Sequence, residues 1–338
     1  MYDLIIIGGS AAATTAGIYG IRRGLNLKII TKDFGGEVAT SGEIGNWPGD
    51  GMIDGITLSD KFKKHLQDYK VEIEEGVLVE KITKQEDPST PLGAGGYFCI
   101  STKKGSGTGM AGEKSASWRI DDKTETLKCD YTAKAVIIAT GVHPRELGIP
   151  GEKEFRNKGV SYCSTCDMPL FAGKTVTVIG GGNSALESAL MGVDIAKKVY
   201  VINKNATFKG DDVLIQKLTS QPKDKVEIFY ETGTKEFVGD KFITGAKYTD
   251  KEGKEFELKT DGIMVHIGMV PNSSIVPDDV DKNPFGEIKV NTRCETNIPG
   301  LYAAGDVSDV PFKQIVIAAG QGCTATLSAV QYLNQLPK

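Results

Sequence analysis

Cysteine and histidine are scarce in this 338-residue chain, which has six cysteines and three histidines. Six cysteines are too few for a structural disulfide framework in a chain of this length. The histidines, His65, His143 and His266, are scattered, and no second Cys or His pair stands at the spacing that a zinc site requires. We therefore predict no metal site.

The chain also lacks a strong charge of either sign and a long apolar run. A net charge of −4 provides no basic surface for nucleic acid, and no hydrophobic stretch approaches membrane-spanning length. The first residues enter an apolar run at once, without the basic-then-apolar layout of a signal peptide. We expect a cytoplasmic protein that binds neither nucleic acid nor membrane.

One supersecondary pattern occurs twice: a strand, a glycine turn, a helix and a second strand. The chain is longer than one hydrophobic core usually allows, so the repeat predicts an α/β protein with two Rossmann-like nucleotide-binding domains, the second inserted in the first. Joints rich in Pro, Gly and Asn lie near residues 144–151 and 271–284. We assign residues 1–147 and 284–338 to the outer domain and 148–283 to the inserted one. The two copies run through 3–7, 8–9, 11–23 and 26–31, and through 175–179, 180–182, 184–196 and 198–203.

The first glycine turn contains Gly8, Ser10 and Ala13. Small residues there let backbone N–H groups approach a pyrophosphate at the helix N-terminus, although Ser10 replaces the middle glycine of the usual fingerprint. The alternative is a plain structural turn, which the flanking strand and helix disfavour. Thr31 ends the second strand where an acidic residue for the ribose is expected, so Asp33 is the candidate for that role.

The second glycine turn has the required strand before it and helix after it. A 2′-phosphate would call for arginines at the end of the following strand, and a 2′-hydroxyl would call for a carboxylate. The chain has neither there; Lys204 and Lys209 could meet a phosphate or could simply be solvated. The candidate nucleotide contacts of this turn are Gly180, Gly182, Asn183, Ser184 and Ala185.

Two cysteines, Cys163 and Cys166, stand just ahead of the second glycine turn. Cysteines separated by two residues can close a small disulfide ring in which one thiolate reacts near neutral pH. Half of a zinc site is the alternative, and it fails for lack of further ligands. The remaining cysteines, Cys99, Cys129, Cys294 and Cys323, are single. Two nucleotide sites and one dithiol indicate a flavin disulfide reductase.

These features together resemble the low-molecular-weight thioredoxin reductases and the flavoprotein subunit of alkyl hydroperoxide reductase. The resemblance covers nearly the whole chain, and the order of its blocks is more specific than any single block. The matching blocks are the Gly8 turn with Ile18-Tyr19, Gly35-Gly36-Glu37 with Asn46-Trp47-Pro48-Gly49, Ala139-Thr140-Gly141, Cys163 to Asp167 with the Gly180 turn, and Pro299 to Asp306 with Lys313-Gln314.

The resemblance implies FAD in the outer domain and NADH or NADPH in the inserted one. It places Cys166 at the flavin, makes Cys163 the residue that attacks the partner, and makes Asp167 the general acid; a helix N-cap is the alternative for Asp167. It also implies a homodimer and a thioredoxin-like or glutaredoxin-like substrate. FAD contacts would come from Gly8, Ser10, Ala13, Asp33, Gly35, Gly36, Thr140, Gly141 and Asp306, with Glu37, Asn46, Lys313, Gln314 and Ile315 near the isoalloxazine.

Three departures from the family pattern leave the electron donor open. Met168 replaces a glycine, Glu37 replaces a glutamine, and the paired arginines that grip the NADPH phosphate are absent. We predict a thioredoxin-disulfide reductase that uses NADH at least as well as NADPH. The alternatives are a disulfide reductase fed by ferredoxin or another flavin, and a flavin redox sensor without turnover. Residues 85–123 are expected to form a β-excursion with a long loop of no assigned function.

Overall fold

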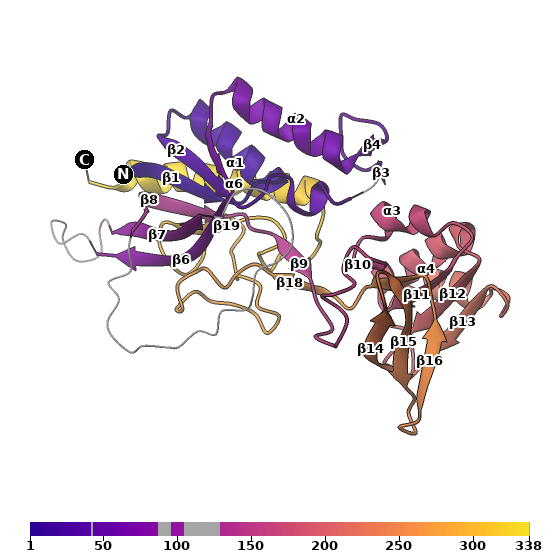
Figure 1. The fold of residues 1–338 in the computed structure, drawn as a ribbon. Helices are drawn as coiled ribbons and strands as arrows, with labels where there is room; N and C mark the ends of the chain where they lie inside the picture. The colour runs from indigo at the N-terminus through magenta and orange to yellow at the C-terminus, as the bar shows by residue number, and fades with distance from the viewer. Residues whose placement is uncertain (42, 87–95, 105–128, 338) are drawn as a thin grey trace. The chain divides into compact units, whose positions relative to one another are not determined.

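The computed structural model describes residues 1–41, 43–86, 96–104 and 129–337 of the chain (Figure 1). It divides into two compact units. Unit 1 comprises Met1–Ala39, Ile44–Val142 and Pro271–Lys338, and unit 2 comprises Thr40–Glu43 and His143–Val270. Much of the predicted loop within residues 85–123 lies outside the described ranges.

Unit 1 is built on a seven-stranded sheet whose main path has the order β5-β2-β1-β8-β7-β6, with β19 pairing on β8. The pairs among β5, β2, β1, β8 and β19 are parallel, and β8-β7 and β7-β6 are antiparallel. The strands are β1 (Tyr2–Ile7), β2 (Leu27–Thr31), β5 (Glu72–Glu75), β6 (Val77–Gln85), β7 (Tyr97–Lys104), β8 (Tyr131–Ile138) and β19 (Leu301–Ala303).

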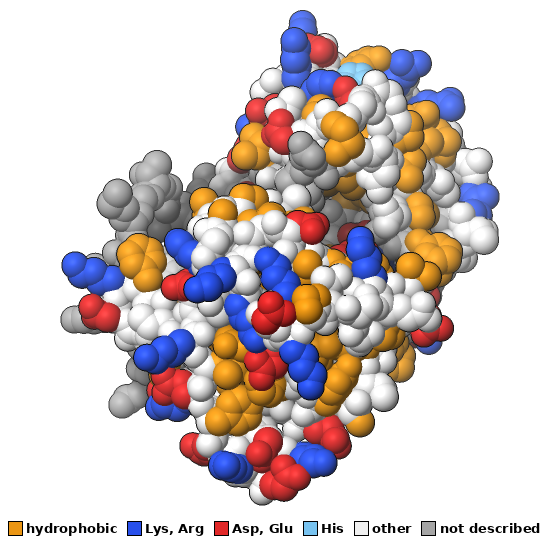
Figure 2. All heavy atoms as spheres, turned by 90° about the vertical axis from the view of Figure 1, so that its right-hand side faces the viewer, with side chains coloured by type: hydrophobic (Ala, Val, Ile, Leu, Met, Phe, Trp, Pro, Cys, Tyr) orange, Lys and Arg blue, Asp and Glu red, His pale blue; other side chains and the backbone are white. Residues whose placement is uncertain are grey.

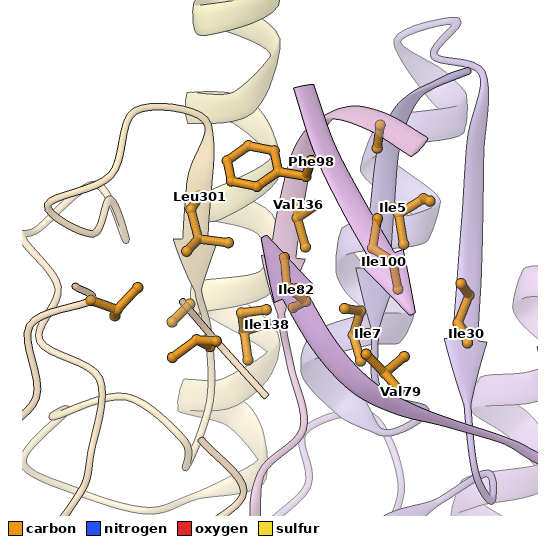
Figure 3. Packing of buried hydrophobic residues seen from close by; sticks show 14 of the residues in the cluster. Ile5, Ile7, Ile30, Val79, Ile82, Phe98, Ile100, Val136, Ile138 and Leu301 are labelled. Atoms are coloured by element: carbon orange, nitrogen blue, oxygen red, sulfur yellow. The ribbon is translucent and has the colours of Figure 1, made fainter. Parts of the chain in front are cut away.

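Both faces of this sheet are buried, which explains why β1 reads as a continuous apolar run rather than an alternating one. Leu4 and Ile6 pack with three helices, α1 (Ala11–Arg22), α2 (Gly55–Asp68) and α6 (Ile315–Gln335). Ile5 and Ile7 point to the other face, where Figure 3 shows them beside side chains of β6 and β7 such as Val79 and Ile100. Each fully buried isoleucine of this core contributes about 1.5–3 kcal/mol.

Helices α1 and α6 cross closely because small residues line their contact. A Cβ atom on Gly322 would lie 2.1 Å from the Ala12 carbonyl oxygen, so only glycine fits there. The Thr326 hydroxyl donates a hydrogen bond to the Ala16 carbonyl oxygen at 3.2 Å. This packing fixes the position of the α1 N-terminus at the edge of the sheet.

Unit 2 repeats the parallel architecture in a five-stranded sheet of order β10-β17-β11-β12-β13. All of its neighbouring pairs are parallel. Its strands are β10 (Val160–Ser161), β11 (Thr175–Ile179), β12 (Lys198–Ile202), β13 (Val226–Phe229) and β17 (Gly262–Val265), and its helical segments are α3 (Ser164–Asp167), η2 (Met168–Phe171), α4 (Asn183–Ile195) and α5 (Asp212–Thr219).

The two faces of this second sheet are covered differently. Val176 and Val178 pack against α4 and η2. Ile179 on the other face packs with Phe237 and Tyr248, which belong to an antiparallel sheet of β14 (Gly233–Gly239), β15 (Ile243–Thr249) and β16 (Glu255–Lys259). The predicted fold class is therefore confirmed: two Rossmann-like domains, with the second inserted in the first.

The remaining short elements lie in the connections. Strands β9 (Val142–Pro144) and β18 (Met269–Pro271) pair with each other and lie at two of the points where the chain passes from one unit to the other. Each strand is directly preceded by a glycine with positive φ, Gly141 at 63° and Gly268 at 109°. The other elements are η1 (Gly36–Val38), β3 (Glu43–Ile44) and β4 (Ile53–Asp54).

The cysteines differ in one respect from the prediction. Cys99 in β7 and Cys129 before β8, both expected to be single, form a disulfide with a Cα–Cα distance of 5.3 Å. Their separation of 30 residues hid the pair, because it is the antiparallel pairing of β7 with β8 that brings the two together. Cys294 is buried and unpaired, and Cys323 is partly exposed and unpaired.

The described residues contain neither a membrane-spanning helix nor a metal-binding cluster. No described helix has the length and hydropathy needed to cross a membrane, and no described cluster of three or more His, Cys, Asp or Glu side chains could hold a metal ion. The face in Figure 2 intersperses positive, negative and hydrophobic side chains without a field of one sign.

Candidate functional site

The first glycine turn lies between β1 and α1, against the loop that follows β8. Gly8 has φ 129°, and a Cβ atom there would lie 2.1 Å from the Ala139 carbonyl oxygen. A Cβ atom on Gly9 would lie 2.7 Å from the Thr31 hydroxyl oxygen. Ser10 occupies the N-cap of α1 without a capping hydrogen bond from its side chain, and the first turn carries no acidic residue. The open N–H groups and the helix dipole suit a diphosphate.

Gly35 and Gly36 pack against this first glycine turn. The Gly35 N–H donates to the Gly9 carbonyl oxygen at 2.7 Å, and a Cβ atom on Gly36 would lie 3.6 Å from the Ser10 Cβ. The Thr31 hydroxyl donates to the Asp33 carbonyl oxygen at 2.5 Å. Asp33 itself is exposed, so its carboxylate stays available for a ribose.

Asp306 places a half-buried carboxyl beside this turn. A Cβ atom on the preceding Gly305 would lie 3.4 Å from the Ala12 Cβ, next to the start of α1. The pKa of the Asp306 carboxyl is raised, mainly by burial; the nearby Lys313 opposes the rise and Glu287 adds to it. No residue in the described part of the chain donates a hydrogen bond to this carboxylate, so its oxygens can accept from another group.

Other predicted contacts of unit 1 have partners within the unit. The Lys313 ammonium donates to the Ser308 carbonyl oxygen at 2.6 Å and pairs with Glu287 at 2.9 Å, so it braces the turn that carries Asp306. The Asn46 amide donates to the Gln314 side-chain oxygen at 3.1 Å, which brings two distant blocks together.

The remaining residues of unit 1 that were predicted to contact FAD lie at three separate places. Ile315 opens α6, and Glu37 lies exposed in η1. Thr140 and Asn272 exchange hydrogen bonds at 2.7 and 2.8 Å next to Gly141.

The second glycine turn borders a cavity of ≈ 500 Å³ that lies within unit 2. Gly180 has φ 148°, and a Cβ atom there would lie 2.0 Å from the His266 carbonyl oxygen. Gly182 is the N-cap of α4 and faces open space. The cavity is lined by Pro144, Leu147, Tyr162, residues 179–185, 202–205, Lys209, and residues 232–234 and 265–269.

The end of β12 carries a buried amide rather than a charged residue. The Asn203 side chain donates to the Thr207 carbonyl oxygen at 2.9 Å and accepts from the Asn205 N–H at 3.1 Å. Its hydrogen bonds are thus used within its own loop. Lys204 and Lys209 line the cavity and are exposed, and no carboxylate of the described residues pairs with either ammonium.

The predicted contacts at the start of α4 have separate local roles. Ala185 is buried beneath the turn and Ser184 is exposed. The Asn183 side chain donates to the Asp211 carboxylate at 3.0 Å and accepts from the Asp211 N–H at 2.7 Å. It ties α4 to the start of α5, and its role toward a nucleotide stays a prediction.

Cys163 directly precedes α3 and Cys166 lies within it, in the same unit as this cavity. Cys163 is disulfide-bonded and accepts, through its carbonyl oxygen, the N–H of Asp167 at 3.1 Å. The side chain of Cys166 is outside the described part of the structure. Asp167 stands at the N-cap position of η2 but makes no capping hydrogen bond with its side chain, so the geometry gives no support to a capping role.

Met168, which replaces a glycine of the family pattern, is fully buried. A Cβ atom on Gly192 in α4 would lie 3.4 Å from the Met168 Cε, so the methionine fills the space above that glycine. The substitution therefore adds packing beneath α3 and places no bulk at the surface.

Sequence reasoning missed one polar cluster beside the cysteines. The Ser164 hydroxyl lies 2.6 Å from the His266 Nε2 and donates to the Ser188 hydroxyl oxygen at 2.5 Å. Burial lowers the pKa of His266 to about 4, which keeps the imidazole neutral at pH 7. The position of Ser164 between the two cysteines was the available signal, and its partners lie too far away in the sequence to be found by spacing.

Known proteins are similar to this chain over nearly its full length. A thioredoxin reductase from Lactococcus lactis matches with a TM-score of 0.78 and 30% identity, covering 99% of this chain and 100% of that one. An alkyl hydroperoxide reductase subunit of Pseudomonas aeruginosa is 36% identical over 98% of this chain. A Bacillus subtilis protein named NADH dehydrogenase is 34% identical over 98% of this chain. The chain spans 58% of the length of each of these two relatives.

The family model described as pyridine nucleotide-disulphide oxidoreductase matches residues 2–322. Proteins of this family use FAD together with NADH or NADPH. The resemblance to the low-molecular-weight thioredoxin reductases is thus confirmed, and the chain belongs to the pyridine nucleotide-disulphide oxidoreductase family.

Proposed function

We propose that this protein is a FAD-dependent disulfide reductase of thioredoxin reductase type, which passes electrons from a nicotinamide nucleotide to a thioredoxin-like or glutaredoxin-like protein. The observation that carries the proposal is the position of the cysteine pair. Cys163 and Cys166 flank the start of α3 in the unit that also holds the second glycine turn and its cavity. A dithiol beside a nucleotide site suits electron transfer better than a structural crosslink.

Unit 1 supplies the FAD site in this proposal. The open α1 N-terminus at Gly8, Ser10 and Ala13 holds the diphosphate, and the half-buried Asp306 carboxylate accepts from hydroxyl groups of the ribityl chain. Asp33 is the remaining carboxylate for the adenosine ribose. The other predicted contacts are backbone or side-chain groups of Gly35, Gly36, Glu37, Asn46, Thr140, Gly141, Lys313, Gln314 and Ile315.

Unit 2 supplies the nicotinamide site, with NADH used at least as well as NADPH. Asn203 offers no charge to either ribose form because an amide is neutral, and its donor and acceptor are already bonded within the loop. Lys204 and Lys209 are exposed point charges that lack the bidentate geometry of arginine and compete with water. The name of the Bacillus subtilis relative, NADH dehydrogenase, agrees with this preference. Gly180, Gly182, Asn183, Ser184 and Ala185 surround the diphosphate position.

The bound cofactors supply hydride transfer to the flavin and two electrons for the protein disulfide. Reduction of the disulfide leaves thiols at Cys163 and Cys166. The Cys163 thiolate then attacks the partner's disulfide and forms a mixed disulfide, and Asp167 gives a proton to the partner thiolate that leaves. Attack by Cys166 on Cys163 releases the second partner thiol and restores the disulfide. Homodimer formation belongs to the same proposal.

Steady-state turnover tests the proposed function. Purified holoprotein is mixed with NADH and a thioredoxin-like protein in its disulfide form, and new thiols are counted against NADH consumed. The proposal expects two thiols for each NADH. Reduction by a ferredoxin-type donor in place of NADH would replace the donor part of the proposal, and flavin reduction without turnover of any dithiol protein would leave a redox sensor.

A further inference from the structure

Three polar side chains meet at the start of α3, where Ser164 follows Cys163 in the sequence. The Ser164 hydroxyl lies 2.6 Å from the His266 Nε2 and 2.5 Å from the Ser188 hydroxyl oxygen. Ser164 and Ser188 are 9% and 2% exposed, and His266 is half-buried. Polar groups removed from water in this way are costly unless each finds a partner, so the cluster holds its members in one arrangement.

The cluster joins three elements of unit 2. Ser164 opens α3 immediately after Cys163, Ser188 lies within α4, and His266 follows β17. The Ser164 hydroxyl has a single proton, so it donates one of its two hydrogen bonds and accepts the other. A neutral imidazole has one donor and one acceptor nitrogen, and the pKa of His266, lowered to about 4 by burial, keeps it neutral.

The imidazole is not needed by the glycine turn that His266 touches. A Cβ atom on Gly180 would meet the backbone carbonyl oxygen of His266 at 2.0 Å, and a Cβ atom on Gly8 would meet that of Ala139 at 2.1 Å. The two positions are therefore equivalent in the repeated architecture. Unit 1 makes the same close contact with only a methyl side chain, so the imidazole in unit 2 serves the other group it contacts, Ser164.

We infer that His266 is a positioning residue for the redox pair: through Ser164 it fixes the backbone between Cys163 and Cys166 and so favours closure of their disulfide. The inference rests on the proposed function, because it takes these two cysteines as the redox pair. A fixed backbone gives one thiol a high effective concentration near the other. Loosening Ser164 gives the open dithiol more freedom than the closed ring, so the equilibrium moves toward the dithiol.

The test is the thiol–disulfide equilibrium of the full-length holoprotein with glutathione, without any nucleotide. The reaction is enzyme disulfide plus two reduced glutathione giving enzyme dithiol plus oxidised glutathione. Rapid alkylation followed by mass spectrometry of the peptide that carries Cys163 and Cys166 gives the ratio of enzyme dithiol to enzyme disulfide. We expect His266→Leu and Ser164→Ala each to shift the constant about five- to tenfold toward the dithiol; tenfold corresponds to about 30 mV.

Coupling and rescue separate positioning from a general loss of structure. The double variant His266→Leu/Ser164→Ala is expected to shift the constant no further than either single change. His266→Gln, whose amide can still reach the Ser164 hydroxyl, is expected to stay within about twofold of the wild type. His65→Leu, at an exposed histidine in α2, is the matched control and leaves the constant unchanged. If His266→Leu fails to fold, Ser164→Ala and His266→Gln carry the test.

The results also separate this inference from the proposed function. Wild-type equilibrium constants in all single variants, or additive shifts in the double variant, would overturn the positioning role while leaving the reductase proposal intact. The expected shifts in a protein that fails to turn over NADH would support the positioning role and refute the reductase proposal. A wild-type pair that never forms a disulfide would refute both.

Discussion

The two glycine turns share one backbone and differ in the side chains around it. In both, a glycine with positive φ follows a parallel strand and presses against the carbonyl oxygen of a residue on the neighbouring strand's exit, Ala139 for Gly8 and His266 for Gly180. The first turn has a half-buried carboxylate beside it, Asp306. The second has a neutral buried amide, Asn203, and an imidazole that reaches α3.

The shared backbone dictates the position of the diphosphate, and the side chains around it are not dictated by the architecture. Helix N-termini at the carboxyl edge of a parallel sheet provide a diphosphate cradle in both units. Side chains that differ between the units surround the expected sugar positions, Asp306 in unit 1 and Asn203 in unit 2. The contact of His266 with Ser164, next to Cys163, is likewise a side-chain feature of unit 2. In the proposed function, unit 1 retains FAD, and unit 2 combines an exchangeable nicotinamide nucleotide with a dithiol.

The largest effect is expected from the cysteines, which only the second unit places beside its turn. Cys163→Ser and Cys166→Ser should each lower disulfide reductase activity by at least about a thousandfold, because both thiols belong to one relay, and should leave the fold and bound flavin intact. Thiol production with NADH measures the effect. Cys323→Ser and the pair change Cys99→Ser/Cys129→Ser are the controls and should keep full turnover. Full activity in either Cys163→Ser or Cys166→Ser would remove the pair from the mechanism.

A methyl group on each glycine should separate the two turns. Gly8→Ala puts a Cβ atom 2.1 Å from a backbone oxygen and should abolish FAD binding, read from the absorbance of the purified protein. Gly180→Ala, at 2.0 Å from its neighbour, should retain FAD and lose about a hundredfold in kcat/KM for NADH. Gly51→Ala, with no atom within 4 Å of the new Cβ, is the control. Loss of flavin from Gly180→Ala would show that the turns are not independent.

The imidazole of the second unit should make stability sensitive to acid. The folded-state pKa of His266 is about 4, below the usual 6.5, so the unfolded state binds the extra proton between these values and stability falls as pH drops through them. Between pH 7 and pH 5 the loss is roughly 2 kcal/mol from this residue. His266→Gln should therefore lose about that much less stability than the wild type in urea denaturation followed by circular dichroism. Equal losses of stability in both proteins between pH 7 and pH 5 would show that the pKa of His266 is not lowered by folding.

The smallest effect concerns the two lysines at the second cavity. Lys204→Ala and Lys209→Ala should each lower kcat/KM for NADPH by about two- to fivefold, as expected for exposed charges, and leave NADH within about twofold. The wild-type ratio should favour NADH or be even. A hundredfold preference of the wild type for NADPH would mean that another group grips the 2′-phosphate.

Local patterns in the sequence predicted most of the architecture. The helix expected at 11–23 is observed at Ala11–Arg22, and the strand expected at 175–179 is observed at Thr175–Ile179. These elements follow from apolar runs and glycine turns, which act over a few residues. The order of the family blocks added FAD and the further site residues.

The features that the sequence left hidden depend on contacts between distant segments. The Ser164–His266 contact spans 102 positions, and the Cys99–Cys129 disulfide depends on the pairing of β7 with β8. In the sequence, Asn203 stands where a charged residue for the ribose was expected. Only the structure shows that its amide donates a hydrogen bond to the Thr207 carbonyl oxygen. A residue's type shows what it can bind, and its partners are settled by tertiary packing.

Anaerobic mixing of the purified protein with NADH tests the central claim most directly. The account predicts that the oxidised flavin absorbance bleaches within the time of turnover and that two thiols appear, both in the peptide that carries Cys163 and Cys166. Flavin that stays oxidised with NADH and with NADPH, or flavin that is reduced without new thiols in this peptide, would contradict the claim that the second unit passes electrons from a nicotinamide to its cysteine pair.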